Sequence, residues 1–291
     1  MNARDWIEEL RQREQLPRDY LFTFRDHVIP LGERISDLRR QKPRGVVVGI
    51  CGAQGSGKST LSLFLERWLR REAGLAVATL SLDDLYFGKQ TREQLGLAIH
   101  PLFETRGVPG THDTALGSDI LRSLISGDAV VAIPVFDKAG DDRVARPEWR
   151  EITAPVDVVL FEGWCVGARP QSTEALSEPV NDLEAGEDPD GSWRRRVNDC
   201  LSGDYADLFG WLDVLAFMRV PSFDKVLEWR TLQEIKLVGH ADEQSMLRFL
   251  AFFERLTRHM QETLPDLANA LIDVDDSHRI SRIVYRDWPS P

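Results

Sequence analysis

The strongest constraint on the fold of this chain is a glycine-rich octapeptide between an apolar run and an amphipathic segment. Residues 52–59 read G-A-Q-G-S-G-K-S, and residues 46–50 before them read V-V-V-G-I. After them, apolar side chains recur at helical spacing from Leu61 to Leu69. The pattern predicts a strand buried on both faces, a tight turn, and a helix over 58–73 that ends at Gly74.

This octapeptide matches G-x-x-x-x-G-K-[ST], the P-loop pattern, in full. A chance match in a flexible loop is the alternative, and the flanking strand and helix argue against it. Glycines let backbone N–H groups curl inward around phosphates, next to the positive end of the helix. We expect Lys58 to reach the β and γ phosphates and Ser59 to ligate magnesium. The chain is therefore predicted to bind ATP and Mg²⁺, with the nucleotide held by Gly52, Ala53, Gln54, Gly55, Ser56, Gly57, Lys58, Ser59 and Thr60.

Three carboxylates follow other strand-like runs. Glu162 ends the run V-V-L-F, and Asp83 and Asp84 follow the strand expected at 76–80, in L-S-L-D-D-L-Y. Carboxyl ends of parallel strands line the crevice where ligands bind. We therefore expect Glu162 at the metal and one aspartate beside the γ-phosphate, where an alcohol needs a proton acceptor. The alternatives are a surface glutamate and a helix cap with a solvated neighbour.

Strand-like and helix-like patterns alternate along the rest of the chain. Apolar runs fall at 76–80, 129–133, 155–161, 213–218 and 270–274, and helical patterns at 115–126, 193–210, 222–238 and 242–262. Residues 86–114 carry many turn formers and little periodicity. We predict an α/β fold, the three-layer P-loop NTPase fold with a mostly parallel central sheet. A helical N-terminal extension is expected at 1–43 and the P-loop domain at 44–291. Within that domain we expect a mobile acidic insertion at 170–191, and its run 184–191 is predicted to be a mobile surface segment.

Composition and sequence patterns argue against several classes of partner and site. The net charge is −11, so no dominant basic patch suits a nucleic acid. No run approaches 18 apolar residues, which argues against a membrane span. The three cysteines lack C-x-x-C spacing, so neither disulfides nor a zinc site are expected. Because the start of the chain lacks the apolar core of a signal peptide, we expect a cytoplasmic protein. The oligomeric state stays open.

Several segments together resemble the D-glycerate 3-kinase family of plants, fungi and bacteria. In order, they are G-A-Q-G-S-G-K-S-T, S-L-D-D-L-Y, R-G-V-P-G-T-H-D, I-P-V-F-D-K, V-V-L-F-E-G-W and V-P-S-F-D-K-V-L-E-W-R-x-x-Q-E. The resemblance runs from about residue 45 to 280. More distantly, the chain is similar to uridine–cytidine kinase, phosphoribulokinase and pantothenate kinase.

This resemblance implies roles for individual residues. Asp83, the first acid after the second strand, takes the place of the catalytic base, and Glu162 helps to hold magnesium. Cations on a lid helix close over the phosphates, which points to Arg230, with Lys236 as a further candidate, and the C-terminal segment brings His278 near the adenine. The substrate side is expected to include Asp84, Tyr86, Arg106, His112, Asp113, Asp137 and Arg143. Phe136 stands where uridine–cytidine kinase has a tyrosine, so a ring-hydroxyl contact is not implied.

The resulting prediction is an ATP- and Mg²⁺-dependent kinase of a small hydroxylated metabolite. Lys58, Asp83 and Arg230 are its expected catalytic residues, and Arg106 could meet an acceptor carboxylate with bidentate geometry. The substrate that the resemblance implies is D-glycerate, giving 3-phosphoglycerate. The alternatives are a kinase of a nucleoside, pantothenate or a sugar, and an NTPase switch without a phosphoryl acceptor.

Overall fold

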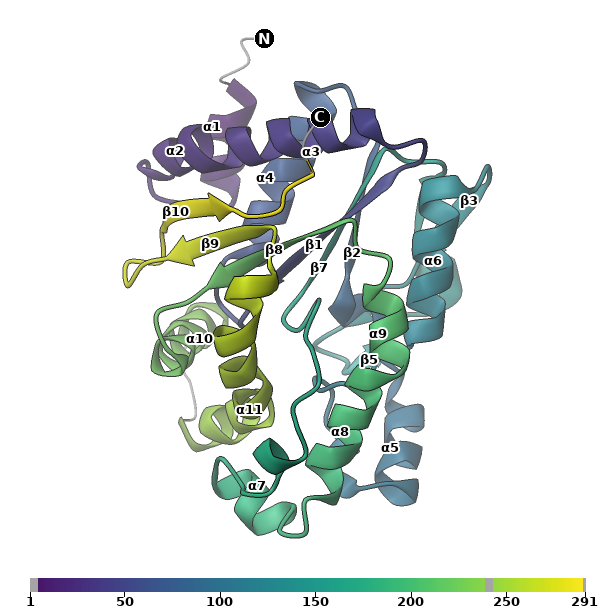
Figure 1. Ribbon diagram of the computed structural model, residues 1–291, viewed down its shortest axis with the longest axis vertical. Helices are drawn as coiled ribbons and strands as arrows, with labels where there is room; N and C mark the ends of the chain where they lie inside the picture. Colours follow the sequence, from purple (N-terminus) through teal and green to yellow (C-terminus); the bar gives the residue numbers. More distant parts are fainter. Residues whose placement is uncertain (1–4, 239–242, 290–291) are drawn as a thin grey trace.

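The computed structural model describes residues 5–238 and 243–289 (Figure 1). Its centre is a six-stranded sheet in the order β10-β9-β8-β1-β7-β2. The strands are β1 (Val46–Gly52), β2 (Val77–Ser81), β7 (Val158–Gly163), β8 (Val214–Arg219), β9 (Ala270–Val274) and β10 (Ile280–Tyr285). Only β10 is antiparallel to its neighbour in this sheet, so the predicted mostly parallel sheet is confirmed.

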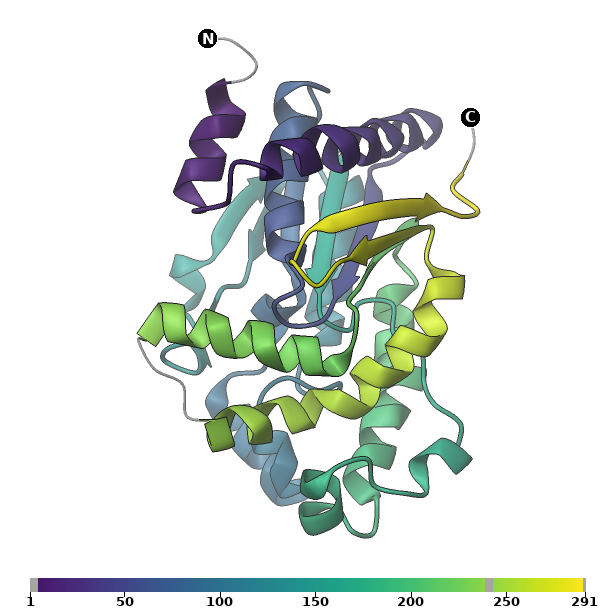
Figure 2. The same ribbon diagram turned by 90° about the vertical axis from the view of Figure 1, so that its left-hand side faces the viewer.

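Successive residues of the central strands face opposite sides of the sheet, and two hydrophobic clusters follow from this alternation. Val46, Val48 and Ile50 of β1 lie in one cluster, and Val47 and Cys51 lie in the other. The first cluster is completed by α1 (Asp5–Arg13), α3 (Ile29–Gln41) and α4 (Lys58–Arg71), and the second by α6 (Thr114–Ser126), α8 (Ser192–Ser202) and α9 (Asp204–Phe209). Helix, sheet and helix thus form three layers, as predicted (Figures 1 and 2).

The N-terminal helices pack directly on β1 and α4. The predicted helical segment consists of α1, the short α2 (Tyr20–Thr23), a π-helical turn at Phe24–Val28 and α3. A Cβ atom on Gly32 would lie 2.4 Å from Trp68 Cε3, so α3 and α4 touch closely at this glycine. The extension therefore buries its apolar face in the same core as β1 and α4.

Several elements differ from the sequence predictions, and three of them are α5, β3 and β10. Helix α5 (Lys89–Ala98) forms within the segment that showed little periodicity. Its sequence pattern was weak because its apolar face is short and only Arg92 and Gly96 of the helix are buried. The strand predicted at 129–133 exists as β3 (Val130–Ile133), but it pairs with β6 (Arg150–Thr153) outside the main sheet. Strand β10 was not predicted, since its residues are half-buried or exposed at the sheet edge.

The remaining elements gather at the end of the sheet where the parallel strands terminate. They are the hairpin strands β4 (Phe136–Asp137) and β5 (Asp142–Arg143) and helices α7 (Asp182–Glu187), α10 (Phe223–Val238) and α11 (Glu243–Leu267). Figure 2 shows α10 and α11 side by side at this end. No helix in the described ranges is long and apolar enough to cross a membrane.

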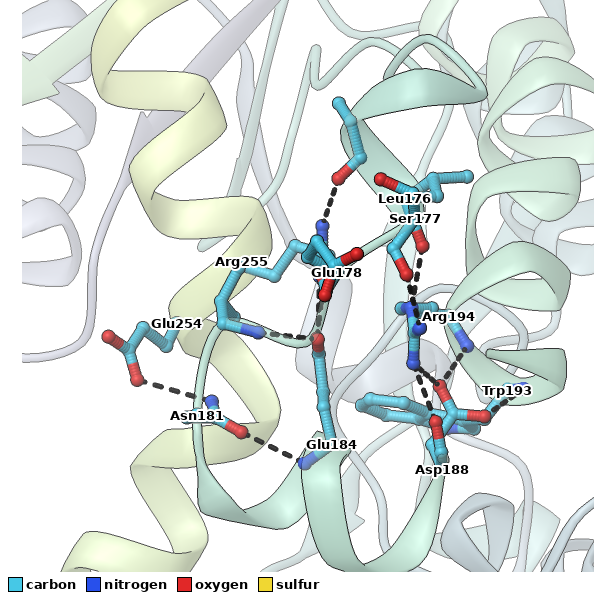
Figure 3. Close-up of polar contacts among 12 residues, drawn as sticks. Leu176, Ser177, Glu178, Asn181, Glu184, Asp188, Trp193, Arg194, Glu254 and Arg255 are labelled. Carbon is cyan, nitrogen blue, oxygen red and sulfur yellow. Dashed lines mark hydrogen bonds and ion pairs between the residues drawn. The ribbon is translucent and has the colours of Figure 1, made fainter. Parts of the chain in front are cut away.

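The acidic segment 170–191 folds around two buried ion pairs (Figure 3). Glu184 of α7 accepts hydrogen bonds from Arg255 of α11, with Nε–Oε1 at 2.7 Å and Nη2–Oε2 at 2.6 Å. Asp188 pairs with Arg194 of α8 at 2.9 Å. The expectation of a surface segment at 184–191 is therefore corrected for these two acids, whose opposite charges come from α11 and from α8, which directly follows the segment. Its mobility stays a prediction.

Candidate active site

The P-loop connects β1 to α4 in the conformation that its glycines permit. Gly55 and Gly57 have φ values of +76° and +92°, in the left-handed region that favours glycine. Gly57 directly precedes Lys58, the first residue of α4. A Cβ atom on Gly52 would lie 2.5 Å from Ser56 Oγ, so a side chain there would displace the Ser56 hydroxyl. The loop therefore stands at a helix N-terminus, where backbone N–H groups bind phosphates.

The predicted metal pair is brought together by strand register. Glu162 lies opposite Ile50 of β1, and the Ser59 hydroxyl contacts Glu162 Oε1 at 3.3 Å. Glu162 is 7% exposed, and its Oε2 is buried without a hydrogen-bond partner in the described part of the chain. Ser56 Oγ and Gln54 Oε1 are buried and unpartnered in the same way. A nucleotide phosphate with Mg²⁺ fits these oxygens, because a hard cation takes hydroxyl and carboxylate ligands.

Helix α10 covers the P-loop. A Cβ atom on Gly55 would lie 3.2 Å from Trp229 Cβ and 3.7 Å from the backbone nitrogen of Arg230. His278 stacks on Trp229, with ring centroids 4.5 Å apart and planes 15° apart, and its Nε2 lies 3.8 Å from a Cβ built on Gly57. Arg230 and His278 therefore both lie at the P-loop, while the Lys236 side chain falls outside the described residues.

The two aspartates after β2 have different partners. Both lie in the 3-10 turn Leu82–Leu85. Lys138 Nζ contacts Asp83 Oδ2 at 2.7 Å, and Asp84 accepts a hydrogen bond from the Phe136 N–H at 3.3 Å. Burial alone would raise the pKa of Asp83, but the charges of Lys138 and Lys58 outweigh it, and the pKa lies below its ordinary value. Burial raises the pKa of Asp84, although Arg150 at 3.6 Å opposes the shift.

His112 is held rigidly beside this turn. Tyr86 and His112 form an isolated antiparallel bridge, and their rings stack at 4.3 Å. Tyr205 Oη contacts His112 Nδ1 and accepts the Gly110 N–H at 3.1 Å. His112 Nε2 is buried without a partner among the described residues. Burial lowers the pKa of His112 to about 3, partly offset by the charge of Asp83, so the imidazole is neutral at physiological pH.

The other predicted substrate residues make structural contacts. Arg106 pairs with Asp141, and Arg143 donates to the carbonyls of Leu85 and Tyr86. Asp113 caps α6 through the Leu116 N–H, and the exposed Asp137 accepts the Ala139 N–H in the hairpin turn. These four side chains hold the acceptor-side loops in place, and their predicted contact with a substrate stays a prediction.

Sequence reasoning missed Lys138, Tyr205 and Trp229. Lys138 and Trp229 stand inside the segments I-P-V-F-D-K and E-W-R-x-x-Q-E, so those segments held a signal for them. Tyr205 carried no such signal, because it lies 93 residues from His112 along the chain.

Comparison with known proteins places the chain among kinases. No protein-family model matches it. It is 34% identical over 225 residues to the uncharacterized kinase mug58 of Schizosaccharomyces pombe. The aligned region covers 71% of this chain and 78% of that protein. It is 27% identical over 213 residues to the chloroplastic D-glycerate 3-kinase of Arabidopsis thaliana, over 68% of this chain and 44% of that one.

A solved structure shows the same fold. D-glycerate 3-kinase from Cryptococcus neoformans matches with a TM-score of 0.73 at 25% identity, over 89% of this chain and 99% of that one. With the P-loop, the Ser59–Glu162 pair and the parallel sheet, these similarities identify an ATP-dependent phosphotransferase. The chain belongs to the D-glycerate 3-kinase family of P-loop kinases.

Proposed function

We propose that the chain phosphorylates a small hydroxy acid, and that D-glycerate, converted to 3-phosphoglycerate, is its substrate. The observation that supports this most directly is the position of Asp83. Its carboxylate lies within electrostatic range of Lys58 of the P-loop and contacts the acceptor-side Lys138 at 2.7 Å. A proton acceptor thus interacts with both a phosphate-binding cation and a cation suited to an anionic acceptor. The names of the Arabidopsis and Cryptococcus relatives favour glycerate among hydroxy acids.

In this proposal Asp83 receives the proton of the acceptor hydroxyl. The hydroxyl oxygen forms a bond to the γ-phosphorus as the bond from that phosphorus to the β–γ bridging oxygen breaks, and ADP leaves. Lys58 and the P-loop N–H groups stabilise charge on the phosphoryl oxygens. Ser59 and Glu162 would hold Mg²⁺, which would neutralise charge on the β and γ phosphates.

Neutral His112 acts as a hydrogen-bond donor to the acceptor. Tyr205 Oη already accepts the Gly110 N–H, so we assign its own proton to His112 Nδ1, which leaves the hydrogen of the imidazole on Nε2. Nε2 is buried and has no partner among the described residues, close enough to Asp83 for the two side chains to interact electrostatically. A substrate hydroxyl or carboxylate oxygen would satisfy this donor.

The test is ATP turnover against a panel of hydroxy acids, nucleosides, sugars and pantothenate. We expect D-glycerate to stimulate Mg²⁺-dependent ADP formation above all other acceptors, with 3-phosphoglycerate as product. The P-loop variant Lys58→Ala should lose this turnover, because its cation contacts the transferring group. Slow turnover that no acceptor stimulates would favour the switch function, and stimulation by another metabolite alone would replace glycerate.

A further inference from the structure

The hairpin β4–β5 is fixed in place by a buried arginine. Arg92 of α5 is 1% exposed and donates to the Asp141 carbonyl at 2.6 Å, while its guanidinium also pairs with the Asp141 carboxylate at 3.0 Å. The same guanidinium donates to the carbonyls of Phe87 and Glu104. Asp141 has a φ of +54°, an uncommon conformation for a residue other than glycine. The backbone of the hairpin is therefore held firmly against α5 and the turn after β2.

Lys138 of this hairpin is the cation best placed to accept a new partner. Four arginines around the acceptor side already have ionic partners: Arg92 and Arg106 pair with Asp141, Arg143 with Asp113, and Arg150 with Asp84. A fifth, Arg146, lies over the Trp149 ring. Lys138 pairs with Asp83, and its side chain is 66% exposed. An ammonium group has three N–H donors, so the contact with Asp83 leaves donors that can face solvent or a ligand.

We propose that Lys138 recognises the negative charge of the acceptor. When the acceptor binds, the Lys138 ammonium leaves Asp83 and contacts the acceptor carboxylate instead. This inference rests on the proposed function and specifies its substrate class as a hydroxy acid. The Lys138 side of this pair is exposed, so water competes for its ammonium and a carboxylate brought in with the acceptor can also compete for it. The exchange releases Asp83 to bind the acceptor hydroxyl, while the fixed hairpin keeps the ammonium within reach.

In this arrangement Lys138 takes the role that was expected for Arg106, which was contact with the acceptor carboxylate. Arg106 has the bidentate geometry suited to a carboxylate, but it is bound to Asp141 and donates to the Lys138 carbonyl at 3.3 Å. Its contacts therefore support the backbone of the residue that we assign to the carboxylate. Lys138 is the specificity-determining residue in this scheme, and Arg106 is a positioning residue.

The experiment compares Lys138→Ala and Lys138→Arg with wild type, using D-glycerate and its uncharged amide. Loss of a charged hydrogen bond should raise the KM for D-glycerate about 10- to 100-fold in Lys138→Ala. The inhibition constant of D-glyceramide against D-glycerate and the KM for ATP should change less than about twofold, since neither depends on this charge. Lys138→Arg should recover part of the loss. The matched control is Lys89→Ala, an exposed lysine whose backbone N–H donates to Asp142 of the same hairpin; it should keep the wild-type constants.

The outcomes separate this inference from the proposed function. Unchanged KM for D-glycerate in Lys138→Ala would overturn the Lys138 assignment and leave glycerate phosphorylation standing. If wild type prefers another anionic acceptor and Lys138→Ala raises its KM, the assignment holds and glycerate is replaced. If wild type phosphorylates only uncharged acceptors, or none, both proposals fail. Equal losses for D-glycerate and the amide would assign Lys138 to the structure of the site and overturn its charge-reading role.

Discussion

Two ion pairs of nearly equal length have opposite environments in this molecule. Asp83–Lys138 spans 2.7 Å, and its side chains are 29% and 66% exposed. Glu184–Arg255 spans 2.6 Å, with exposures of 1% and 9%, and Arg255 also donates to the carbonyls of Ala175 and Glu178 (Figure 3). The same chemical contact is thus open to a ligand at the acceptor site and closed inside the 170–191 segment.

Solvation explains what each pair can do. An exposed pair contributes about 0–1 kcal/mol, because water competes for both charges. In a buried pair, both ions have lost their water, so removing one partner leaves the other charge uncompensated. We therefore assign the exposed pair to catalysis and the buried pair to the fold.

The largest effect should come from breaking the exposed pair at its acid. Asp83→Asn keeps the size of the side chain but removes the charge that receives the proton. We expect kcat for acceptor phosphorylation to fall by about 10²- to 10⁴-fold, the usual range for general-base assistance. The KM for ATP and the melting temperature should stay close to wild type.

Asp84→Asn is the control, since its carboxylate binds the Phe136 N–H and Arg150 instead of Lys138. It should cost much less in kcat. If Asp84→Asn is the crippled variant, the roles of the two aspartates are reversed. If neither variant changes acceptor-dependent turnover, the turn after β2 carries no base.

Breaking the buried pair should change stability instead. Glu184→Gln leaves Arg255 buried without its counter-ion, and we expect the free energy of unfolding to fall by roughly 3–5 kcal/mol, measured by urea denaturation. The matched control is Glu187→Gln on the same helix. Glu187 pairs with Arg248 of α11, and these side chains are 44% and 53% exposed. This control should lose less than about 1 kcal/mol. Equal losses in both variants would contradict the assignment by burial.

Glu162 is a third kind of acid, buried with one oxygen unpartnered among the described residues. Its environment predicts a ligand that supplies the missing positive charge. Glu162→Gln should raise the Mg²⁺ concentration for half-maximal activity by about tenfold, because one charged ligand contact is weakened. Mg²⁺ titration of turnover at saturating substrates measures this. An unchanged titration curve would place Glu162 outside the metal site.

The P-loop was predictable because the residues that bind the nucleotide are contiguous in the sequence. Glycines with positive φ, a lysine and a serine at fixed spacing specify a backbone conformation as well as its ligand. Glu162 was predictable from its place at a strand end, since parallel strands bring such residues to one edge. Both signals are local, and both describe the nucleotide side of the site.

The acceptor side and the Glu184–Arg255 pair depended on contacts between distant segments. Lys138 lies 55 residues from Asp83 along the chain, and Arg255 lies 71 residues from Glu184. An acidic, turn-rich stretch has the same composition whether its carboxylates face water or a buried arginine. The burial of these carboxylates therefore could not be inferred from composition, and residues 184–191 were predicted to form a mobile surface segment.

The smallest expected effect is the change of kcat with pH. It tests the contrast between the buried imidazole of His112 and the exposed side chain of Lys138. Burial lowers the pKa of His112 to about 3. The pKa of Asp83 also lies below its ordinary value, because Lys138 and Lys58 outweigh its burial. The other titratable groups near Asp83 are Tyr86 and Cys165, whose pKa values burial raises well above their ordinary range, and Asp84, whose pKa burial also raises.

These pKa shifts predict that kcat changes little with pH around neutrality. Asp83 accepts a proton only as a carboxylate, so activity falls as pH drops through its pKa, below the ordinary value of about 3.9. His112 stays neutral down to about pH 3. We therefore expect kcat at saturating Mg·ATP and acceptor to vary less than about twofold between pH 5.5 and 7.5, where an ordinary histidine would titrate. A decline near pH 6.5 that disappears in His112→Gln would show that water reaches this imidazole. A decline that persists in His112→Gln would belong to another group and leave the burial of His112 intact.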